Sequence, residues 1–542
     1  MSGRLVTFTG TLRLARLVLR RDRVRLPLWL LGMTAVTGGS AAGIEGLYPT
    51  EREQAAYVRS NAAGAVSRVF NGIVPEVGTG GIVIAETFTI VAVLAALMSV
   101  FTVVRHTRAN EETGRAEMVG SAAVGRHAGL AAVLLVTAGA QLLLAFLLAG
   151  ALAAAGLPVA GSLAAGAAIG AAGAVFAGVA AVTAQIAESA RAASGVAAAV
   201  LGLAFLLRAA GDGLATPGED MRVDSLWPSW LSPIGWAQRV RPYGGDDWWP
   251  LALHALLLAV LVRAAFALTD HRDVGTGMLP VRRGPAEAAR GLLSPLGLAW
   301  RLQRGVLYGW AAGMLIVGLA LGAVGDQAEE VLGGSDRLEE MMGRLAGGGD
   351  LVDVYFTAMM GLIAVIAAGY TVQALLRMRD EETGPLEAVL ATAVSRPRWM
   401  LAHILCATFG TAVLLLVIGL GNGLAYAAAA GSLEKVPSLA GAAMVRLPAT
   451  LALAGFVVAV IGLLPRLAVA LSWAALGACL VIGQLGPILE LPRPVMNISP
   501  FSHTPSLPSA DLAVMPVAVL AGVALLLTAA GVMLFRRRDL AF

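Results

Sequence analysis

Apolar and polar positions alternate along the chain in long blocks. Twelve apolar runs, most of them near twenty residues or longer, are separated by polar segments, and about 20 apolar residues in a helix cross the core of a bilayer. The expected spans are residues 26–44, 81–104, 128–155, 159–186, 190–210, 248–269, 305–325, 354–376, 399–429, 438–463, 467–488 and 511–535. A helix satisfies its own backbone polar groups in lipid. The pattern therefore predicts an all-α polytopic membrane protein with about 12 transmembrane helices.

Two of the polar segments are similar in sequence. The tetrapeptide EETG at 111–114 returns 270 positions later at 381–384, and the segments 111–126 and 381–396 agree at nine of sixteen positions without a gap. The shared residues singled out are Glu111, Glu112, Thr113, Gly114, Glu117 and Arg126 in the first copy and Glu381, Glu382, Thr383, Gly384, Glu387 and Arg396 in the second. A match of this length between distant loops indicates an internal duplication.

Each copy has the local signals of a short helix. Gly114 and Gly384 can serve as N-caps, and the glutamate three positions later meets the free amides of the first turn. Leu386, Val389 and Leu390 then recur at helical spacing and predict one apolar face. Such a helix is expected to lie flat at an interface. The alternative is a capped amphipathic turn that only closes a loop.

The duplication extends to the whole chain. The second half restarts near residue 295, where Trp310 follows the pattern set by Trp29, and Arg272 and Arg538 close the sixth and twelfth spans. Six crossings in each half give both halves the same orientation, which makes them a parallel repeat. The expected organisation is residues 1–273 as the first half, 274–294 as a linker and 295–542 as the second half.

The basic residues predict the orientation. Of 39 arginines and lysines, 26 lie in the two termini, the EETG segments, the linker and the other loops of that side, whereas the opposite loops carry ten. Positive charge favours the cytoplasmic side, so both termini and both EETG segments are expected in the cytoplasm, in a multi-pass protein of the inner or plasma membrane. The net charge of +4 then reflects topology, and no nucleic-acid partner is indicated.

Two further polar regions flank the spans. Arginines at spacings of three and four in residues 6–25 predict a basic helix in the headgroup layer, or alternatively a plain positive anchor. Residues 45–80 and 326–353 are polar in both halves, and we expect small extracellular caps there.

Motifs for catalysis and for cofactors are absent from the sequence. Cys406 and Cys479 each lie in an apolar run, so neither a disulfide framework nor a metal cluster is indicated. No GxxxxGK[ST] motif occurs, so the chain has no P-loop to bind ATP phosphates. We expect no catalytic residue, no metal and no cofactor bound by this chain, and any ATP hydrolysis in another polypeptide.

The second copy, EETGPLEAVLATAVSRPRWMLA, resembles the cytosolic loop of type-2 ABC exporter permeases, where an acidic pair, a glycine and a Leu-Glu step precede the third span. The fused double six-span layout is similar to that of actinobacterial permeases described as exporters of polyketide antibiotics and other drugs. The resemblance implies that segments 111–126 and 381–396 are coupling helices for two copies of an ATP-binding subunit, which would hold ATP and Mg²⁺. The first copy departs from the pattern at Arg115 and Ala116, so its docking is expected to be weaker.

Polar residues within the spans are candidates for the cargo path, because burial of an ionisable group in a span is costly and a functional role is the default hypothesis for it. They are Glu86, Gln141, Gln373, Asn422 and Arg446. Spans rich in Ala, Leu, Val and Gly suit apolar or amphipathic cargo. Snorkelling or structural pairing is the alternative for the arginine.

Two other functions remain open on the sequence. A secondary transporter could be driven by protons through Glu86 and the histidines, although the second half has no acid at the position that matches Glu86. A membrane scaffold or immunity protein that transports nothing would need no ATPase partner.

Overall fold

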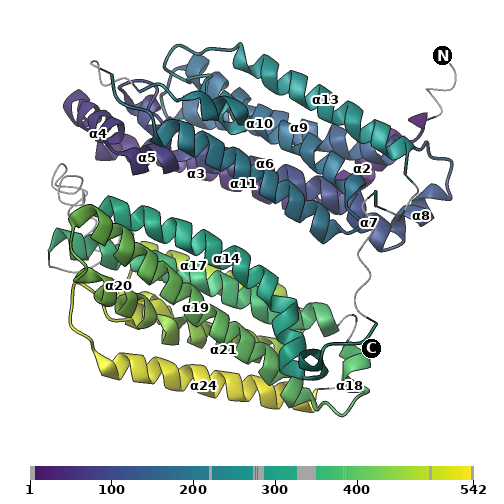
Figure 1. Cartoon of the computed structure of the whole chain (residues 1–542), viewed down its shortest axis with the longest axis vertical. Coiled ribbons are helices and arrows are strands. Elements are labelled where there is room, and N and C mark those ends of the chain that lie inside the picture. The colour runs from purple at the N-terminus through teal and green to yellow at the C-terminus, as the bar shows by residue number, and fades with distance from the viewer. Residues whose placement is uncertain are drawn as a thin grey trace. The chain divides into compact units, whose positions relative to one another are not determined.

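The computed structural model of the chain describes residues 7–218, 223–272, 275, 277–278, 286–325, 350–382, 384, 386–486 and 491–538. Every regular element in these ranges is a helix, which confirms the predicted fold class. The chain separates into two compact units, Met1–Arg283 and Gly284–Phe542, and the division falls inside the expected linker. Figure 1 shows the first unit in purple to teal and the second in teal-green to yellow.

The first unit is built from long helices joined by short ones. Its long helices are α3 (Arg25–Leu47), α6 (Thr79–His106), α9 (Ala128–Ala154), α10 (Val159–Ile186), α11 (Ala190–Gly213) and α13 (Pro250–Asp270). The shorter elements are α2 (Thr11–Arg21), α4 (Glu51–Ala63), α5 (Ala65–Phe70), α7 (Arg108–Glu112), α8 (Arg115–Gly120), the 3₁₀ turn η1 (Trp227–Leu231) and α12 (Pro233–Gln238).

The second unit repeats this plan. Its long helices are α14 (Pro295–Gly325), α17 (Leu351–Glu382), α19 (Arg396–Ala430), α21 (Leu447–Leu463) and α24 (Val514–Arg537), and the shorter α22 (Ala468–Leu480) precedes α24. The shorter elements are η2 (Arg290–Leu293), α18 (Leu386–Leu390), α20 (Lys435–Met444), the π-helical turn η3 (Val481–Leu485), α23 (Arg493–Met496) and the 3₁₀ turn η4 (Pro500–His503).

Ten helices of the described part are long and apolar enough to cross a membrane. They coincide with ten of the twelve expected spans. The remaining two expected spans are also helical: residues 26–44 form α3, which is rich in glycine, serine and threonine, and residues 467–488 contain a shorter apolar helix, Ala468–Gly483. The chain is therefore a polytopic membrane protein.

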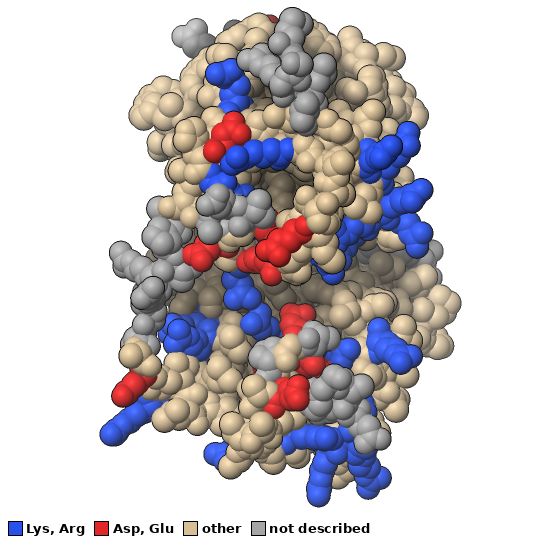
Figure 2. Space-filling view, turned by 90° about the vertical axis from the view of Figure 1, so that its right-hand side faces the viewer, with Lys and Arg blue, Asp and Glu red and all other residues tan. Residues whose placement is uncertain are grey.

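The two EETG copies mark one end of each unit, which we call the EETG end. In the first unit α7 and α8 lie at this end, while α4 and α5 lie at the opposite end (Figure 1). In the second unit α18 lies at the EETG end. Figure 2 looks onto these ends and shows acidic and basic side chains interleaved on them.

The chain termini lie at the same ends. In the first unit the amides of Gly125 and His127 donate to the carbonyl oxygens of Thr9 and Thr7 at 2.9 and 3.0 Å. In the second unit the Arg538 guanidinium pairs with Glu382. The first described residues and the last, Arg538, thus lie beside the EETG copy of their own unit.

The first span begins differently in the two units. In the first unit Asp22 separates α2 from α3, and its carboxylate is almost fully buried. His106 Nε2 lies 2.7 Å from Asp22 Oδ2, and Arg105 pairs with the same carboxylate. A buried carboxylate needs such partners, so this cluster fixes the junction. The expected helix over 6–25 is thus shortened to α2, whereas α14 is continuous.

Of the two expected extracellular caps, only the first lies in the described part. Residues 45–80 form α4 and α5, and α4 begins with a capping box in which Thr50 and Glu53 bond each other's backbone amides. Most of the second segment, residues 326–349, lies outside the described residues.

Small residues let the helices pack closely. In the first unit α10 crosses α9 at Gly166 and Gly170, where a β-carbon would lie 2.1 Å from the Ala145 carbonyl oxygen and 2.9 Å from that of Gln141. In the second unit a β-carbon on Gly322 of α14 would lie 2.2 Å from the backbone carbonyl oxygen of Asn422. Small residues four positions apart are the usual means of close contact between membrane helices.

We expect Gly166→Ala to destabilise the first unit by about 1–3 kcal/mol, because the added methyl group meets backbone that cannot move aside without shifting a helix. The measurement is the apparent Tm of the purified protein in detergent. Gly150→Ala is the matched control, since Gly150 lies in α9 with nothing within 4 Å of its β-position. Equal Tm values for the two variants would contradict the close crossing.

Candidate functional site

The first EETG copy forms a sharp break between two short helices. α7 ends at Glu112, and the Thr113 hydroxyl donates to the Ala109 carbonyl oxygen at 2.9 Å. Gly114 then adopts φ +69°, a left-handed conformation that favours glycine, and α8 begins at Arg115 with Glu117 in its first turn. The predicted N-cap at Gly114 is confirmed.

The second copy breaks at the same place. α17 runs through to Glu382, and α18 spans Leu386–Leu390; Thr383 and Pro385 lie outside the described residues. Leu386 is fully buried, and Val389 packs against the core of the unit, which confirms the predicted apolar face.

The expected helices over 111–126 and 381–396 are too long. α8 has six residues and α18 has five. In the first copy the left-handed Gly114 separates α8 from α7, and both copies leave the helix in a turn before the next span begins.

In the first unit Glu111 is the centre of an arginine cluster. The Arg272 guanidinium, from the end of α13, donates to both carboxylate oxygens of Glu111 at 2.6 Å. Arg108 Nη1 donates to the same carboxylate at 2.5 Å. All three side chains are largely buried, with 12% of Glu111, 6% of Arg272 and 1% of Arg108 exposed. A bidentate arginine pair of this kind is both strong and directional.

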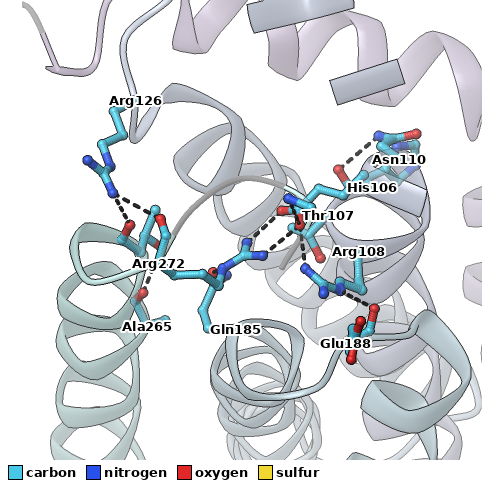
Figure 3. A network of polar contacts seen from close by, with 12 residues as sticks. His106, Thr107, Arg108, Asn110, Arg126, Gln185, Glu188, Ala265 and Arg272 are labelled. Atoms are coloured by element: carbon cyan, nitrogen blue, oxygen red, sulfur yellow. Dashed lines mark hydrogen bonds and ion pairs between the residues drawn. The ribbon is translucent and has the colours of Figure 1, made fainter. Parts of the chain in front are cut away.

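Arg272 joins further elements at this point (Figure 3). Its Nε donates to Gln185 Oε1 at the end of α10 at 3.0 Å. Its own carbonyl oxygen accepts from Arg126 Nη2 at 3.1 Å, and Arg126 also donates to the carbonyl oxygen of Thr269 at 2.6 Å. The ends of α6, α10 and α13 and the start of α9 are therefore tied together directly beside α8.

The first copy also contacts the start of α11. Glu112 Oε1 accepts the amide of Ala190 at 2.9 Å, and Arg108 Nε donates to the carbonyl oxygen of Glu188 at 2.9 Å. A carboxylate is favourable at the N-terminus of a helix. α7 is thereby joined to the connection between α10 and α11.

The second unit contains the same arrangement. Glu382 pairs with Arg379 and with Arg538, which follows α24. Arg538 Nη1 donates to the Ile461 carbonyl oxygen near the end of α21 at 2.7 Å. The Arg538 carbonyl oxygen accepts from Arg396 Nη1 at 2.7 Å. Arg126 and Arg396, and Arg272 and Arg538, thus have matching roles.

The arginine-bound acid differs by one position between the copies. Glu111 has this role in the first unit and Glu382 in the second, although the sequence aligns Glu111 with Glu381. Glu381 instead points into α19, where Trp399 Nε1 donates to it at 3.2 Å and His403 Nε2 lies at 3.3 Å. The repeat in the sequence located the site but gave no indication of this change of register.

Sequence reasoning found only part of the cluster. It noted Arg272 and Arg538 only as matching ends of the two halves, and it did not single out Arg108 or Gln185. One arginine follows the last span of each half, on the side of the acidic pair. This recurrence is the signal that could have assigned Arg272 and Arg538 to the acidic pairs.

The outward face of the short helices carries other groups. Glu117 and Glu387 are exposed, and Met118 of α8 is 70% exposed. These side chains offer a carboxylate on each unit, and on α8 an apolar contact, to a partner, whereas Glu111, Glu381 and Glu382 are engaged within their units.

Glu86 lies far from this site, near the opposite end of the first unit. Its carboxylate accepts hydrogen bonds from Tyr57 of α4 and, at 3.1 Å, from Asn71 Nδ2. The structure thus places this candidate path residue where α6 joins the extracellular cap expected from the sequence.

Three of the other four candidate path residues are hydrogen-bonded to neighbouring helices. Gln141 Nε2 donates to Ala95 O at 2.9 Å and to Ser99 Oγ at 2.8 Å. Arg446 Nη2 donates to Thr357 O at 3.1 Å. Gln373 is exposed and accepts from Trp310 Nε1 at 2.8 Å. Asn422 is fully buried, and no partner of its side-chain amide occurs among the described residues.

Comparison with known proteins identifies a family model and a relative. The family model described as "Multidrug efflux system permease Rv1217c, C-terminal domain" matches residues 292–536. The "Multidrug efflux system permease protein Rv1217c" of Mycobacterium tuberculosis (strain ATCC 25618 / H37Rv) is 40% identical to this chain over 538 residues, which cover 98% of this chain and 95% of that protein.

Proposed function

Because the chain belongs to the family of multidrug efflux system permeases, we propose that it is the transmembrane permease subunit of an ATP-driven ABC exporter. Its cargo is apolar or amphipathic compounds, including drugs and antibiotics, and it moves them out of the cell. Two copies of a separate ATP-binding subunit supply the power, one at α8 and one at α18. ATP and Mg²⁺ bind in those partners.

The observation that carries this proposal is the arginine cluster, which occurs in both units. In each unit it joins an acid of the EETG pair, just before the short helix, to the ends of the fourth and sixth spans and to the start of the third. α8 and α18 each begin four residues after this acid, so a displacement of either helix acts on several spans through a short connection. A helix to which an ATP-binding subunit docks needs such a connection if the subunit is to move the spans.

The proposed cycle is alternating access. Closure of the ATP-binding subunits rocks the two halves between inward-open and outward-open states, as in other two-state switches. The topology that this requires has both termini and both EETG copies in the cytoplasm. Its support is the excess of basic residues on that side and the position of each terminus beside the EETG copy of its unit.

In this proposal the EETG copies have two roles. Glu117 and Glu387 are exposed and in this proposal contact the ATP-binding subunits. Glu111 and Glu382 are positioning residues, because they act through the arginines that hold the spans.

We expect the double variant Glu117→Gln, Glu387→Gln to bind the ATP-binding subunit about tenfold more weakly, since each loses one charged contact across an interface. Co-purification and stimulation of ATPase activity measure this. The apparent Tm should not change, because both side chains are exposed. The charge-matched control is Glu51→Gln, Glu434→Gln, which also changes one exposed glutamate in each unit.

Two outcomes would count against the proposal. Unchanged binding and ATPase stimulation in the Glu117, Glu387 variant would remove α8 and α18 as docking helices. Efflux in vesicles that have a proton gradient but no ATP would favour the proton-coupled alternative instead.

A further inference from the structure

A groove opens beside α8 at the EETG end of the first unit. It has a volume of about 530 Å³ and lies between α2, α7, α8, the start of α9 and the ends of α10 and α13. We call it the α2–α8 groove. Its volume falls in the range of sites for small molecules, roughly 300–1,000 Å³.

The polar lining of the groove is strongly basic. Arg21, Arg115 and Arg126 line it and are exposed. Arg21 donates to Asn110 Oδ1 at 3.0 Å, and Arg126 donates to backbone carbonyls. No hydrogen bond or ion pair of Arg115 occurs within the described part of the chain.

Negative charge does not balance these arginines. Glu111 also lines the groove, but it is neutralised by Arg272 and Arg108. Asp270 lies near Arg126, with Oδ1 3.7 Å from Nε, and accepts from His127 at 2.8 Å. The groove therefore presents an excess of positive charge to whatever enters it.

The remaining wall is apolar. α2 contributes Leu14, Leu17 and Val18, and α9 contributes Leu130 and Val133. α2 is a surface helix that buries Ala15 and Val18 against the unit and exposes both arginines and leucines, as helices in the headgroup layer of a membrane do. Basic and apolar surfaces thus meet within one cavity, at the level where lipid headgroups lie.

We propose that the α2–α8 groove binds one anionic phospholipid. The phosphate lies among Arg21, Arg115 and Arg126, and part of an acyl chain lies along Leu14, Leu17 and Leu130. The chemistry recognised is a phosphate joined to an apolar tail, and its source is the bilayer around the protein. This inference does not depend on ATP-driven transport. As a consequence, the bound lipid connects α8 to α2 and stabilises the position of α8.

Native mass spectrometry of the detergent-purified full chain tests the site. The probes are phosphatidylglycerol, phosphatidylcholine and glycerol phosphate. We expect one phosphatidylglycerol bound per chain, with affinity falling about fivefold for each arginine removed in Arg21→Gln, Arg115→Gln. The control Arg20→Gln, Arg23→Gln removes two exposed arginines from the same N-terminal segment outside the groove and should change the affinity less than twofold.

A second variant tests the cavity without changing charge. Gly129 of α9 lines the groove, and its β-position has nothing within 4 Å. A leucine there points into the space that the lipid would fill, so Gly129→Leu should lower phosphatidylglycerol binding at least fivefold while the apparent Tm of the lipid-free protein stays within a few degrees of wild type.

Several results would overturn the proposal. Equal losses in the control and the groove variant would show general attraction of anionic lipid to a basic surface. Glycerol phosphate binding as well as phosphatidylglycerol would remove the role of the apolar wall. Unchanged lipid binding together with poorer recovery of an ATP-binding subunit would assign the arginines to a protein partner.

Discussion

Arg272→Met is expected to lower the free energy of unfolding by roughly 2–4 kcal/mol and to abolish most drug efflux. Glu111 is 88% buried and loses the bidentate partner that neutralises it, and breaking a buried pair by removing one member costs about 3–5 kcal/mol. Arg108 remains bonded to Glu111, which is why the expected loss is somewhat smaller than that range. Efflux falls because α13 loses its side-chain link to Glu111 of α7 and keeps the bonds from Arg126 to its backbone.

The apparent Tm in detergent and drug accumulation in cells measure the two effects. Arg263→Met is the matched control, because Arg263 is an exposed arginine of the same helix α13. The double variant Glu111→Gln, Arg272→Met removes both charges and should cost less than the sum of the two single changes. If the single costs simply add, the pair is not coupled and the proposed tie between α7 and α13 is wrong.

Asp212→Ala is expected to destabilise the first unit by about 3–5 kcal/mol, because it leaves a buried guanidinium without its counter-charge. Asp212 and Arg208 of α11 are both fully buried and pair at 3.2 Å. Ser225 donates to the same carboxylate, and the Arg68 Nε donates to the Asp212 carbonyl oxygen at 3.0 Å.

Two more arginines depend on this aspartate. Burial lowers the pKa of the Arg68 and Arg239 guanidiniums, and the Asp212 charge opposes that change in both. Removal of Asp212 therefore leaves three arginines close together at this end of the unit. The apparent Tm is the measurement, and Asp247→Ala, at an exposed aspartate of the same unit, is the control. A Tm equal to that of the control would show that the cluster needs no anion.

The sequence predicted the spans well for a physical reason. A long apolar run has few solutions in lipid other than a helix, so residues 81–104 and 354–376 lie within α6 and α17. The break at Gly114 was also predictable, because glycine is favoured in the left-handed conformation there. Such features depend on neighbours along the chain.

The partners of the site were not predictable in the same way. Glu111 and Arg272 lie 161 positions apart, and the packing of α6 and α13 against α10 brings them together. The length of α8 was overestimated because the apolar spacing continues past the point where the backbone turns. The exposure of Glu117 and the burial of Glu382 likewise depend on tertiary packing.

The change of register between the two acidic pairs affects how genetic screens of this protein should be designed. A screen that mutates each residue together with its counterpart 270 positions away would test Glu111 beside Glu381, whose neighbours are Trp399 and His403. Different phenotypes would then be mistaken for unequal halves. Alleles paired as Glu111 with Glu382 and Arg272 with Arg538 compare groups with the same task, and only such pairs can reveal whether the two halves contribute equally to efflux.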